Sequence, residues 1–192
     1  MTISTFQVAA SGDDAAWIQS SSTSDTTSTS HVITSGNTGA KIHFGARFAL
    51  TLPPRAVIVT AELQLKWRAV GAGNDMKATI RAHDVDDSAS FGTESVLAKL
   101  AEPTGAAVNW FVDDVVGFTD QFTSYGPNIR ELIEEIVDRA GWTSGNHAAI
   151  LLEAGGTPAK YFEAYSYDHA AGDAAKLVVE WLDPATTWIP KA

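Results

Sequence analysis

Residues 128–146 read NIRELIEEIVDRAGWTSGN and carry the clearest helical pattern in the chain. Apolar side chains recur every three or four residues and so share one face of a helix: Ile129, Leu132, Ile133, Ile136, Val137 and Ala140. Asn128 is a suitable N-cap, with Glu131 in capping-box position, and Gly141 is a suitable left-handed C-cap. We therefore expect an amphipathic helix at about 128–140, followed by Trp142 as a plug between helix and sheet.

Strand-like alternation of apolar and polar residues begins at Lys41, well before this helix. It runs over residues 41–50, 57–69 and 76–83, with turn residues between the three segments. One apolar and one polar face per strand is typical of an antiparallel sheet with one side in solvent. The predicted outer face of this sheet is basic, with Lys41, Arg47, Lys66, Arg68, Lys77 and Arg81.

Further short apolar segments predict strands on both sides of this region: 3–9, 14–18, 106–111, 114–118, 148–154, 161–167 and 175–182. The number and spacing of these segments favour a mainly β protein, a single antiparallel β-sandwich that is jelly-roll-like. We expect this domain to span 1–183 and a C-terminal arm to span 184–192. A Ser/Thr-rich segment at 20–30 lies within the domain; its composition is typical of a linker, but such residues also pair as edge strands.

Composition limits the classes of function. The chain has 192 residues, 45% hydrophobic and 19% charged residues, a net charge of −10 and no cysteine. These values fit one globular domain without disulfides and argue against nucleic acid and membrane as partners. The first residues lack the pattern of a secretion signal, so we expect a protein that is made in the host cytoplasm and either acts there or leaves by assembly or lysis.

Charge is distributed unevenly, because residues 41–81 carry seven basic and two acidic side chains. Such polarity can guide assembly or docking on an acidic partner, and it is equally typical of a solvated basic face. Elsewhere, Asp84, Asp86 and Asp87 resemble an acidic calcium loop, although the glycine and distal glutamate of an EF-hand are missing. Calcium is the one cofactor that the sequence suggests, and a solvated turn is the alternative.

Catalytic motifs are absent from the sequence. It contains no nucleophile elbow, phosphate-binding loop or zinc-protease helix, and its five histidines lack a metal-binding spacing. We therefore expect no enzymatic activity. The aromatic residues are more informative, since Tyr161, Tyr165 and Tyr167 alternate along one predicted strand. They could form a row that binds glycan or is buried by a partner subunit.

Several motifs together resemble a known family. They are Ala46-Arg47-Phe48, LPPRAVIVTAELQL at 52–65, TGAAVNW at 104–110, PNIRELIEEIVDRAGWTSGN at 127–146, AYSYD at 164–168 and KLVV at 176–179. This ordering resembles β-sandwich modules of the DNRLRE type, which occur in extracellular bacterial proteins and in phage virion proteins. The resemblance implies a sandwich used for carbohydrate binding, adhesion or particle architecture.

Two functions of different class follow as expectations. The first is a non-enzymatic structural protein of a bacteriophage virion (a capsid decoration, head-fibre or tail-associated protein) that associates with itself and with other virion proteins. The second is a carbohydrate-binding or adhesion module that recognises a surface polysaccharide. The two are compatible, because a virion protein can bind host glycan.

Overall fold

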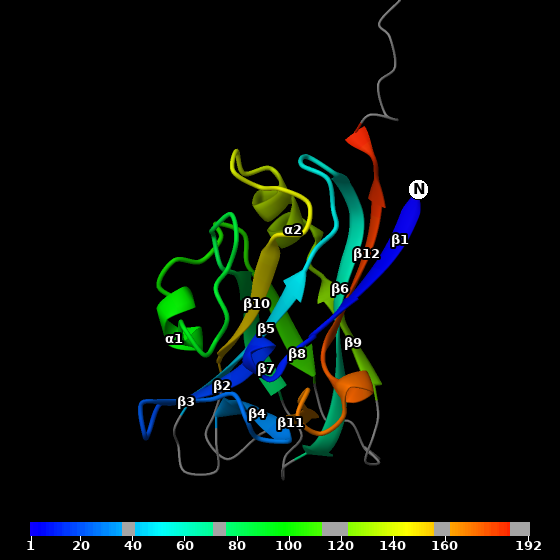
Figure 1. The fold of residues 1–192 in the computed structure, drawn as a ribbon. Helices are drawn as coiled ribbons and strands as arrows, with labels where there is room; N and C mark the ends of the chain where they lie inside the picture. Colours follow the sequence, from blue (N-terminus) through cyan, green and yellow to red (C-terminus); the bar gives the residue numbers. More distant parts are fainter. Residues whose placement is uncertain (36–40, 71–75, 113–122, 156–161, 185–192) are drawn as a thin grey trace, which may run out of the picture.

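The computed structural model describes residues 1–35, 41–70, 76–112, 123–155 and 162–184. Twelve strands, two short α-helices and two 3-10 turns account for most of them (Figure 1). The strands are β1 (Thr2–Gln7), β2 (Asp14–Ile18), β3 (Thr23–Asp25), β4 (Ser30–Ser35), β5 (Lys41–Ala49), β6 (Val57–Val70), β7 (Met76–Ala82), β8 (Val108–Val112), β9 (Thr123–Asn128), β10 (His147–Ala154), β11 (Phe162–Tyr165) and β12 (Lys176–Leu182). The helices are α1 (Val96–Lys99) and α2 (Arg130–Val137).

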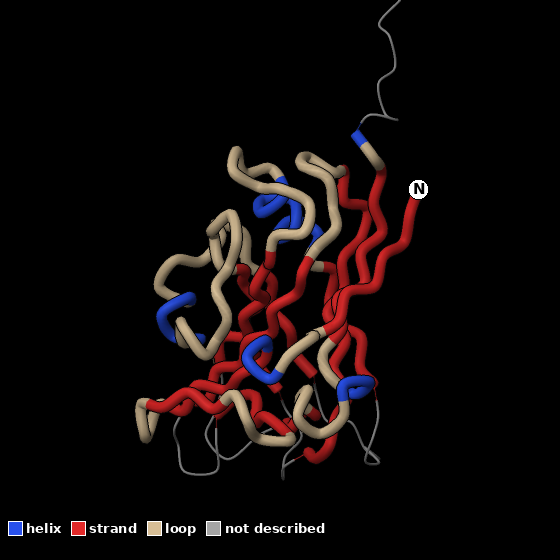
Figure 2. The backbone as a smooth tube through the Cα atoms, viewed as in Figure 1, coloured by secondary structure: helices blue, strands red, loops and turns tan. Residues whose placement is uncertain are grey.

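The strands form a sandwich of two antiparallel sheets, which confirms the predicted fold class. The first sheet has the order β1-β12-β6, and β9 also pairs with β6. The second sheet has the order β5-β10-β7-β8, with β2 on β5 and β3 on β2. β4 pairs with β5 and with β11, and β11 pairs with β6, so hydrogen-bonded strands also link the two sheets. Figure 2 shows that strands, in red, make up most of the body of the molecule.

The core lies between the sheets, and α2 closes one end of it. Leu132, Ile133, Ile136 and Val137 of α2 are fully buried, as the apolar stripe predicts. Trp142 is 2% exposed, and its indole N–H donates to the carbonyl oxygen of Leu52 at 3.1 Å. The prediction that Trp142 is a packed plug beside the helix is therefore confirmed. No helix of the described residues is long and apolar enough to cross a membrane.

The helix itself is shorter than predicted. α2 begins at Arg130, and Asn128 is the last residue of β9. Its side-chain oxygen accepts hydrogen bonds from the backbone N–H groups of Ala61 and Arg130, so Asn128 still contacts the start of the helix as predicted. Ala140, predicted to belong to the apolar face of the helix, is exposed. Gly141 was predicted as the left-handed C-cap, but among the described glycines the one with positive φ is Gly145, at 101°. Gly141 instead lies against the carboxylate of Asp86, and a Cβ atom at this position, 2.1 Å from that carboxylate, would require the Asp86 side chain to move.

The prediction that residues 41–83 form one sheet is wrong. β5 and β7 belong to the second sheet, where β10 separates them, whereas β6 is a central strand of the first. Alternation shows which side chains of a strand face the core but not which strands are neighbours. The outward residues of β6 therefore lie on the opposite side of the sandwich from those of β5 and β7.

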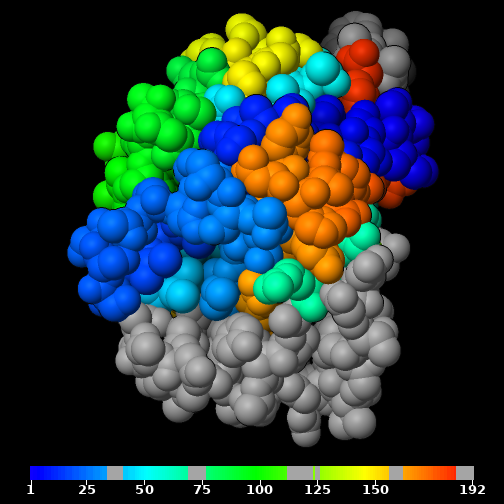
Figure 3. All heavy atoms as spheres, turned by 60° about the horizontal axis from the view of Figure 1, so that its bottom comes forward, coloured from blue at the N-terminus to red at the C-terminus, as the bar shows by residue number. Residues whose placement is uncertain are grey.

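The Ser/Thr-rich segment packs on the sandwich as an edge structure. Thr23–Asp25 pair with β2, and the Asp25 carboxylate accepts hydrogen bonds from the N–H groups of Thr27 and Ser28. The Ser166 hydroxyl donates to the Ser28 carbonyl oxygen and connects the segment to the chain between β11 and β12. Figure 3 shows the two segments side by side, in blue and orange. Contacts within the chain are thus sufficient to hold residues 20–30.

Candidate functional site

Part of the outer face of the second sheet is covered by residues 84–105, which we call the cover segment. A small second cluster of buried apolar side chains forms beneath it: Ala15, Phe91, Val96, Ala149 and Leu151. Gly45 of β5 permits this contact, because a Cβ atom there would lie 2.5 Å from the Phe91 ring. The cover segment adds a third layer to the two sheets on this side of the molecule.

A buried polar network also holds the cover segment. Lys99 is 0% exposed, and its ammonium donates to the Glu94 carboxylate at 2.7 Å and to the Ser88 hydroxyl at 3.0 Å. The Ser88 hydroxyl can in turn donate to Nδ1 of His83, also at 3.0 Å. Burial lowers the pKa of Lys99 and of His83, and the hydrogen bond from Lys99 lowers the pKa of Glu94. The network is therefore an ion pair between a fully buried ammonium and a carboxylate whose side chain is 33% exposed, with two polar neighbours.

A serine hydroxyl next to a lysine amine also occurs in enzymes that use serine as a nucleophile. Here Ser88 is 1% exposed and lies beneath the cover segment, so a substrate carbonyl cannot reach its oxygen. Both ends of the pair are occupied by hydrogen bonds within the fold. We therefore assign this network to stability rather than to chemistry.

Beside the cover segment, the same outer face carries a row of side chains that crosses five strands. Trp17 of β2 lies opposite His43 of β5, and the pairing of Phe44 with Leu152 puts Glu153 of β10 next in line. Thr79 of β7 pairs with Glu153, and Asn109 of β8 pairs with Thr79. Four steps between adjacent strands make this row about 19 Å long. We call these five residues the Trp17–Asn109 row.

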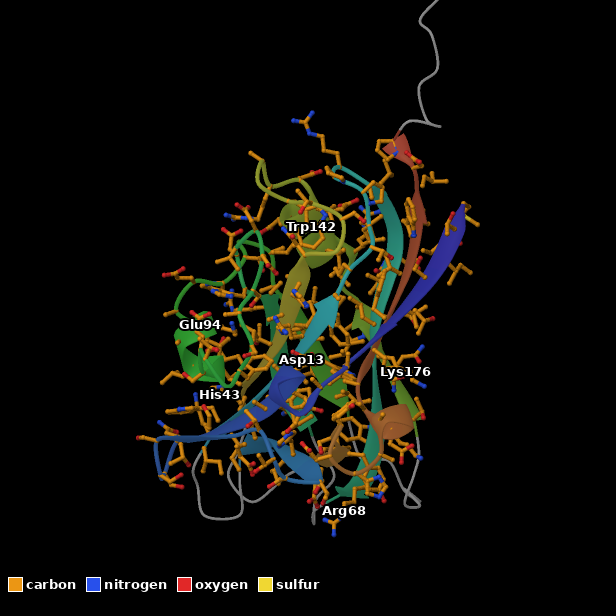
Figure 4. All side chains as sticks on the ribbon, viewed as in Figure 1. Asp13, His43, Arg68, Glu94, Trp142 and Lys176 are labelled. Atoms are coloured by element: carbon orange, nitrogen blue, oxygen red, sulfur yellow. The ribbon has the colours of Figure 1, made fainter. Side chains whose placement is uncertain are left out.

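A groove of about 460 Å³ lies where this row meets the cover segment. Its lining consists of Trp17, Gln19, Lys41, His43 and Glu153 from the sheet and Leu97, Leu100 and Ala101 from in and around α1. Leu97 is 43% exposed, which is high for a leucine that lines a concave surface. The His43 and Glu94 labels in Figure 4 mark this side of the molecule, with Lys176 on the opposite side.

Hydrogen-bonding groups of defined direction surround the indole in this groove. Nδ1 of His43 accepts from the N–H of Ala154 at 3.1 Å, so the neutral ring carries its proton on Nε2. Burial lowers the pKa of His43 and favours this neutral form. The Gln19 amide oxygen accepts from the N–H of Lys41 at 3.2 Å, which leaves the amide NH₂ group as a donor. Glu153 pairs with Arg81 at 3.2 Å and its side chain remains 44% exposed.

The predicted basic face is divided between the two sheets. Lys41, Arg47, Lys77 and Arg81 belong to the second sheet, and Lys66 and Arg68 belong to the first. Four of the six are paired with carboxylates: Arg47 with Asp13, Lys66 with Asp173, Arg68 with Glu163 and Arg81 with Glu153. The prediction of one continuous basic face is therefore wrong. Lys41 and Lys77 remain exposed, beside the Trp17–Asn109 row.

The predicted tyrosine row does not form among the described residues. Tyr161 lies outside them, Tyr165 is 7% exposed, and Tyr167 is half-buried in the turn after β11. The Tyr165 ring stacks on His169 with centroids 4.0 Å apart. A register shift between Glu163 and Ala164 breaks the alternation on which the prediction depended.

The acidic residues of the predicted calcium loop have partners within the protein. Arg139 donates to Asp86 at 2.7 Å and also to Asp84, and this fixes the loop to the chain after α2. Asp87 accepts from the backbone N–H of His147 at 2.8 Å, and the His147 ring lowers its pKa further. No group of three acidic or histidine side chains in the described part of the chain is arranged to hold a metal ion. Calcium binding stays a prediction without geometric support.

Sequence reasoning missed the residues that form the groove. Trp17 and Ala15 are two residues apart and so lie on the same face of β2. This is the outer face of the second sheet, where the cover segment packs on Ala15 and partly on Trp17. A tryptophan two residues before Gln19, near the end of a short strand, was a usable signal, since such a strand need not direct its largest residue toward the main core. Glu153 and Asn109 carry no comparable signal, because their position depends on strand order.

Comparisons with known proteins add one distant structural similarity. No family model matches the chain, and the search of curated proteins gives no match. Among solved structures, the chain is similar to an exo-beta-1,3-galactanase from Phanerochaete chrysosporium that was crystallised with galactose. The identity is 8% and the TM-score 0.36, over 94% of this chain and 30% of that chain. A similarity at this level carries no inference about function.

Proposed function

We propose that this protein is a carbohydrate-binding module that holds a short glycan along the Trp17–Asn109 row. The observation that carries the proposal is the combination, in one groove, of an indole ring with side chains that can bind hydroxyl groups. Sugar rings present apolar C–H faces and a rim of hydroxyls, so they need a flat apolar surface bordered by donors and acceptors. Trp17 provides the surface, and Gln19, His43 and Glu153 provide the border.

The length of the row fits an oligomer better than a single sugar. Thr79 and Asn109, which hydrogen-bond to each other at 3.2 Å, extend the polar line beyond the groove on the side away from Trp17. At about 19 Å the row can accommodate several linked sugar rings. Lys41 and Lys77 lie beside it and favour glycans that are neutral or acidic over basic ones.

Binding without cleavage is the activity that we propose. Glycoside hydrolysis generally requires two carboxyl groups about 5–10 Å apart on opposite sides of the scissile bond. Of the described residues that line the groove, Glu153 is the one with a carboxylate, and it is paired with Arg81. This arrangement supports recognition of a glycan and offers no second carboxylate in the groove for acid–base catalysis.

A glycan array followed by calorimetry on the strongest ligand tests the proposal. We expect Trp17→Ala to reduce affinity about tenfold or more, as for other buried tryptophan contacts. A matched pair of threonine variants locates the site: Thr79→Ala should weaken binding, whereas Thr60→Ala, on the outer face of the first sheet, should not. Absence of binding across the array, or equal loss in both threonine variants, would contradict the proposal.

A second candidate is a structural component of a bacteriophage virion, which the motif resemblance supports. One structural observation favours it, namely exposed large apolar side chains outside the groove, among them Met1 (81% exposed), Ile3 (68%) and Phe111 (58%). Met1 and Ile3 lie at the edge of the first sheet and Phe111 lies on β8 of the second, so contacts with two different neighbouring subunits would cover them. Electron microscopy of virions with antibodies against this protein tests the idea, and absence of label on intact particles would contradict it.

A further inference from the structure

The first sheet ends in a strand with an open edge. β1 pairs along its whole length with β12, from Thr2 opposite Trp181 to Gln7 opposite Lys176. On its other side, no strand of the described ranges pairs with it. Figure 1 shows β1 at the outer margin of the sandwich, next to β12. As far as the described residues show, its outer backbone N–H and C=O groups are therefore available for pairing.

This edge lacks the features that usually prevent strands from associating. Exposed edges in monomeric proteins are interrupted by bulges or proline, or carry charged side chains, lysine above all. β1 reads TISTFQ, without a charged residue, proline or glycine, and its register with β12 has no shift. Ile3 is 68% exposed on this edge strand, although isoleucine is among the residues most often buried.

The directions of the β1 side chains restrict the register in which a second strand can pair with its open edge. Ile3 and Thr5 point outward and Phe6 points into the core, where it is 8% exposed. An added antiparallel strand must place its outward residues opposite Ile3 and Thr5, because a shift by one residue would reverse its faces. β1 of a second copy meets this condition when the two strands are centred on Ser4. Ile3 of each copy then lies opposite Thr5 of the other, a favourable pair of β-branched residues.

Charge explains why two copies can meet here in spite of a net charge of −10. On the outer face, β12 places Glu180 beside Ile3, Val178 beside Thr5 and Lys176 beside Gln7. In the pairing centred on Ser4, Glu180 and Ile3 of one copy lie in line with Thr5 and Val178 of the second copy. No carboxylate therefore faces a carboxylate across the new strand pair, and the two edge strands are themselves uncharged.

We propose that two copies of this protein form a symmetric dimer by antiparallel pairing of their β1 strands, which joins their first sheets into one continuous sheet. A two-fold axis through this contact uses the same surface of both copies, as in most homodimers. The partner is thus a second copy, held by backbone hydrogen bonds and by the Ile3–Thr5 contacts. The glycan groove lies on the second sheet and stays accessible in the dimer. The inference is independent of the proposed glycan binding.

Light scattering and native mass spectrometry over a concentration series, from low micromolar to near millimolar, test this inference. We expect a dimer that increases with concentration, and at least a tenfold weaker association for Ile3→Lys, which brings a charge to the edge. Thr60→Lys is the matched control, since it places the same charge on the same outer face, two strands away from the edge. It should dimerise like the unmodified protein.

Hydrogen exchange provides a readout that depends on the backbone. The amides of residues 2–7 should exchange more slowly at high protein concentration, and Ile3→Lys should remove this difference while leaving exchange in β6 unchanged. A monomer at every concentration, or equal dimerisation of the two lysine variants, would overturn the inference. Dimers without concentration-dependent protection of residues 2–7 would overturn it too, because the contact would then lie elsewhere.

Discussion

The two outer faces of the sandwich differ in what packs on them, and this difference determines where we propose that ligand binds. The second sheet carries the cover segment, and the groove forms along the margin of this third layer. On the first sheet, the outward Lys66 and Arg68 instead form ion pairs with Asp173 and Glu163. A sheet surface is nearly flat, so a concave site on it requires an additional layer. The first sheet carries a smaller hollow of about 220 Å³, where residues 172–174 lie over Gln64 and Lys66. We infer that the face with the cover segment binds ligand and that the first sheet extends at its edge.

The largest effect should come from the interior that both sheets share. We expect Trp142→Ala to lower the free energy of unfolding by about 3–5 kcal/mol, because it creates a large cavity and leaves the Leu52 carbonyl without its donor. Urea denaturation measures this change. Trp17→Ala is the control: loss of its half-buried indole should cost clearly less stability, while glycan affinity should fall about tenfold or more. Equal losses of stability would show that Trp17 belongs to the core.

The next effect concerns the ion pair of the cover segment. Glu94→Gln leaves the buried Lys99 ammonium without a counter-charge and should lower stability by about 1–3 kcal/mol in urea denaturation. Glu163→Gln removes the partner of Arg68, whose side chain is 50% exposed, and should cost less than about 1 kcal/mol. If the two variants are equally stable, the buried network does not hold the cover segment.

A perturbation of similar size acts on the contact between the cover segment and the second sheet. Gly45→Ala places a methyl group against the Phe91 ring, and we expect a loss of about 1–3 kcal/mol from overpacking. Limited proteolysis should show faster cleavage within residues 84–105, and glycan affinity should fall as the groove wall shifts. Gly172→Ala, at a position where a Cβ atom meets no other atom within 4 Å, should change neither property.

A fall in pH should also destabilise the packing of the cover segment on the second sheet, and we expect this to be the smallest of the effects. Burial, followed by the charge of Lys99, lowers the pKa of His83 below its ordinary 6.5, and nearby carboxylates oppose this only in part. The unfolded chain then binds more protons than the folded one as the pH falls below 6.5, so stability decreases. Glu94, with a pKa below its ordinary 4.5, adds a further loss at lower pH.

Proteolysis of the cover segment at pH 7 and pH 5 measures this loss. His83→Asn can keep the hydrogen bond with Ser88 without a titrating ring, so it should reduce the difference between the two conditions. An unchanged difference in this variant would place the pH dependence elsewhere, for example at His43, whose pKa burial also lowers.

Local patterns were sufficient to predict most of the fold. Alternation placed β5, β6 and β7 within a few residues, and the apolar stripe of α2 correctly named its buried residues. α1 was missed, since a helix of four residues has too few positions to show a period, and β4 was missed too. β3 lies in the Ser/Thr-rich segment, for which the sequence left a linker and an edge strand as alternatives. β9 was missed for another reason, because it contains Gly126 and Pro127, which read as a turn before the helix.

The site was harder to predict, because it depends on which strands are neighbours. The prediction of one basic face was wrong because β6 belongs to the first sheet and not to the sheet of β5 and β7. The prediction of a tyrosine row was wrong because the register of β11 shifts between Glu163 and Ala164. The burial of Lys99 within residues 84–105 could not be foreseen, since a lysine is rarely found without solvent contact. Where the chain lacks a regular period, sequence reasoning identifies residues but not their neighbours.

The place of β12 has a consequence for how the chain folds during synthesis. β12 lies between β1 and β6 and pairs with both, so residues 2–7 find their partner only once residues 176–182 have left the ribosome. Contacts that span so much sequence form slowly, because the loop-closure entropy must be overcome first. Until then β1 is an uncharged strand without its partner on a partly folded chain. Early encounters between nascent chains through this strand are therefore the step at which misassembly competes with folding.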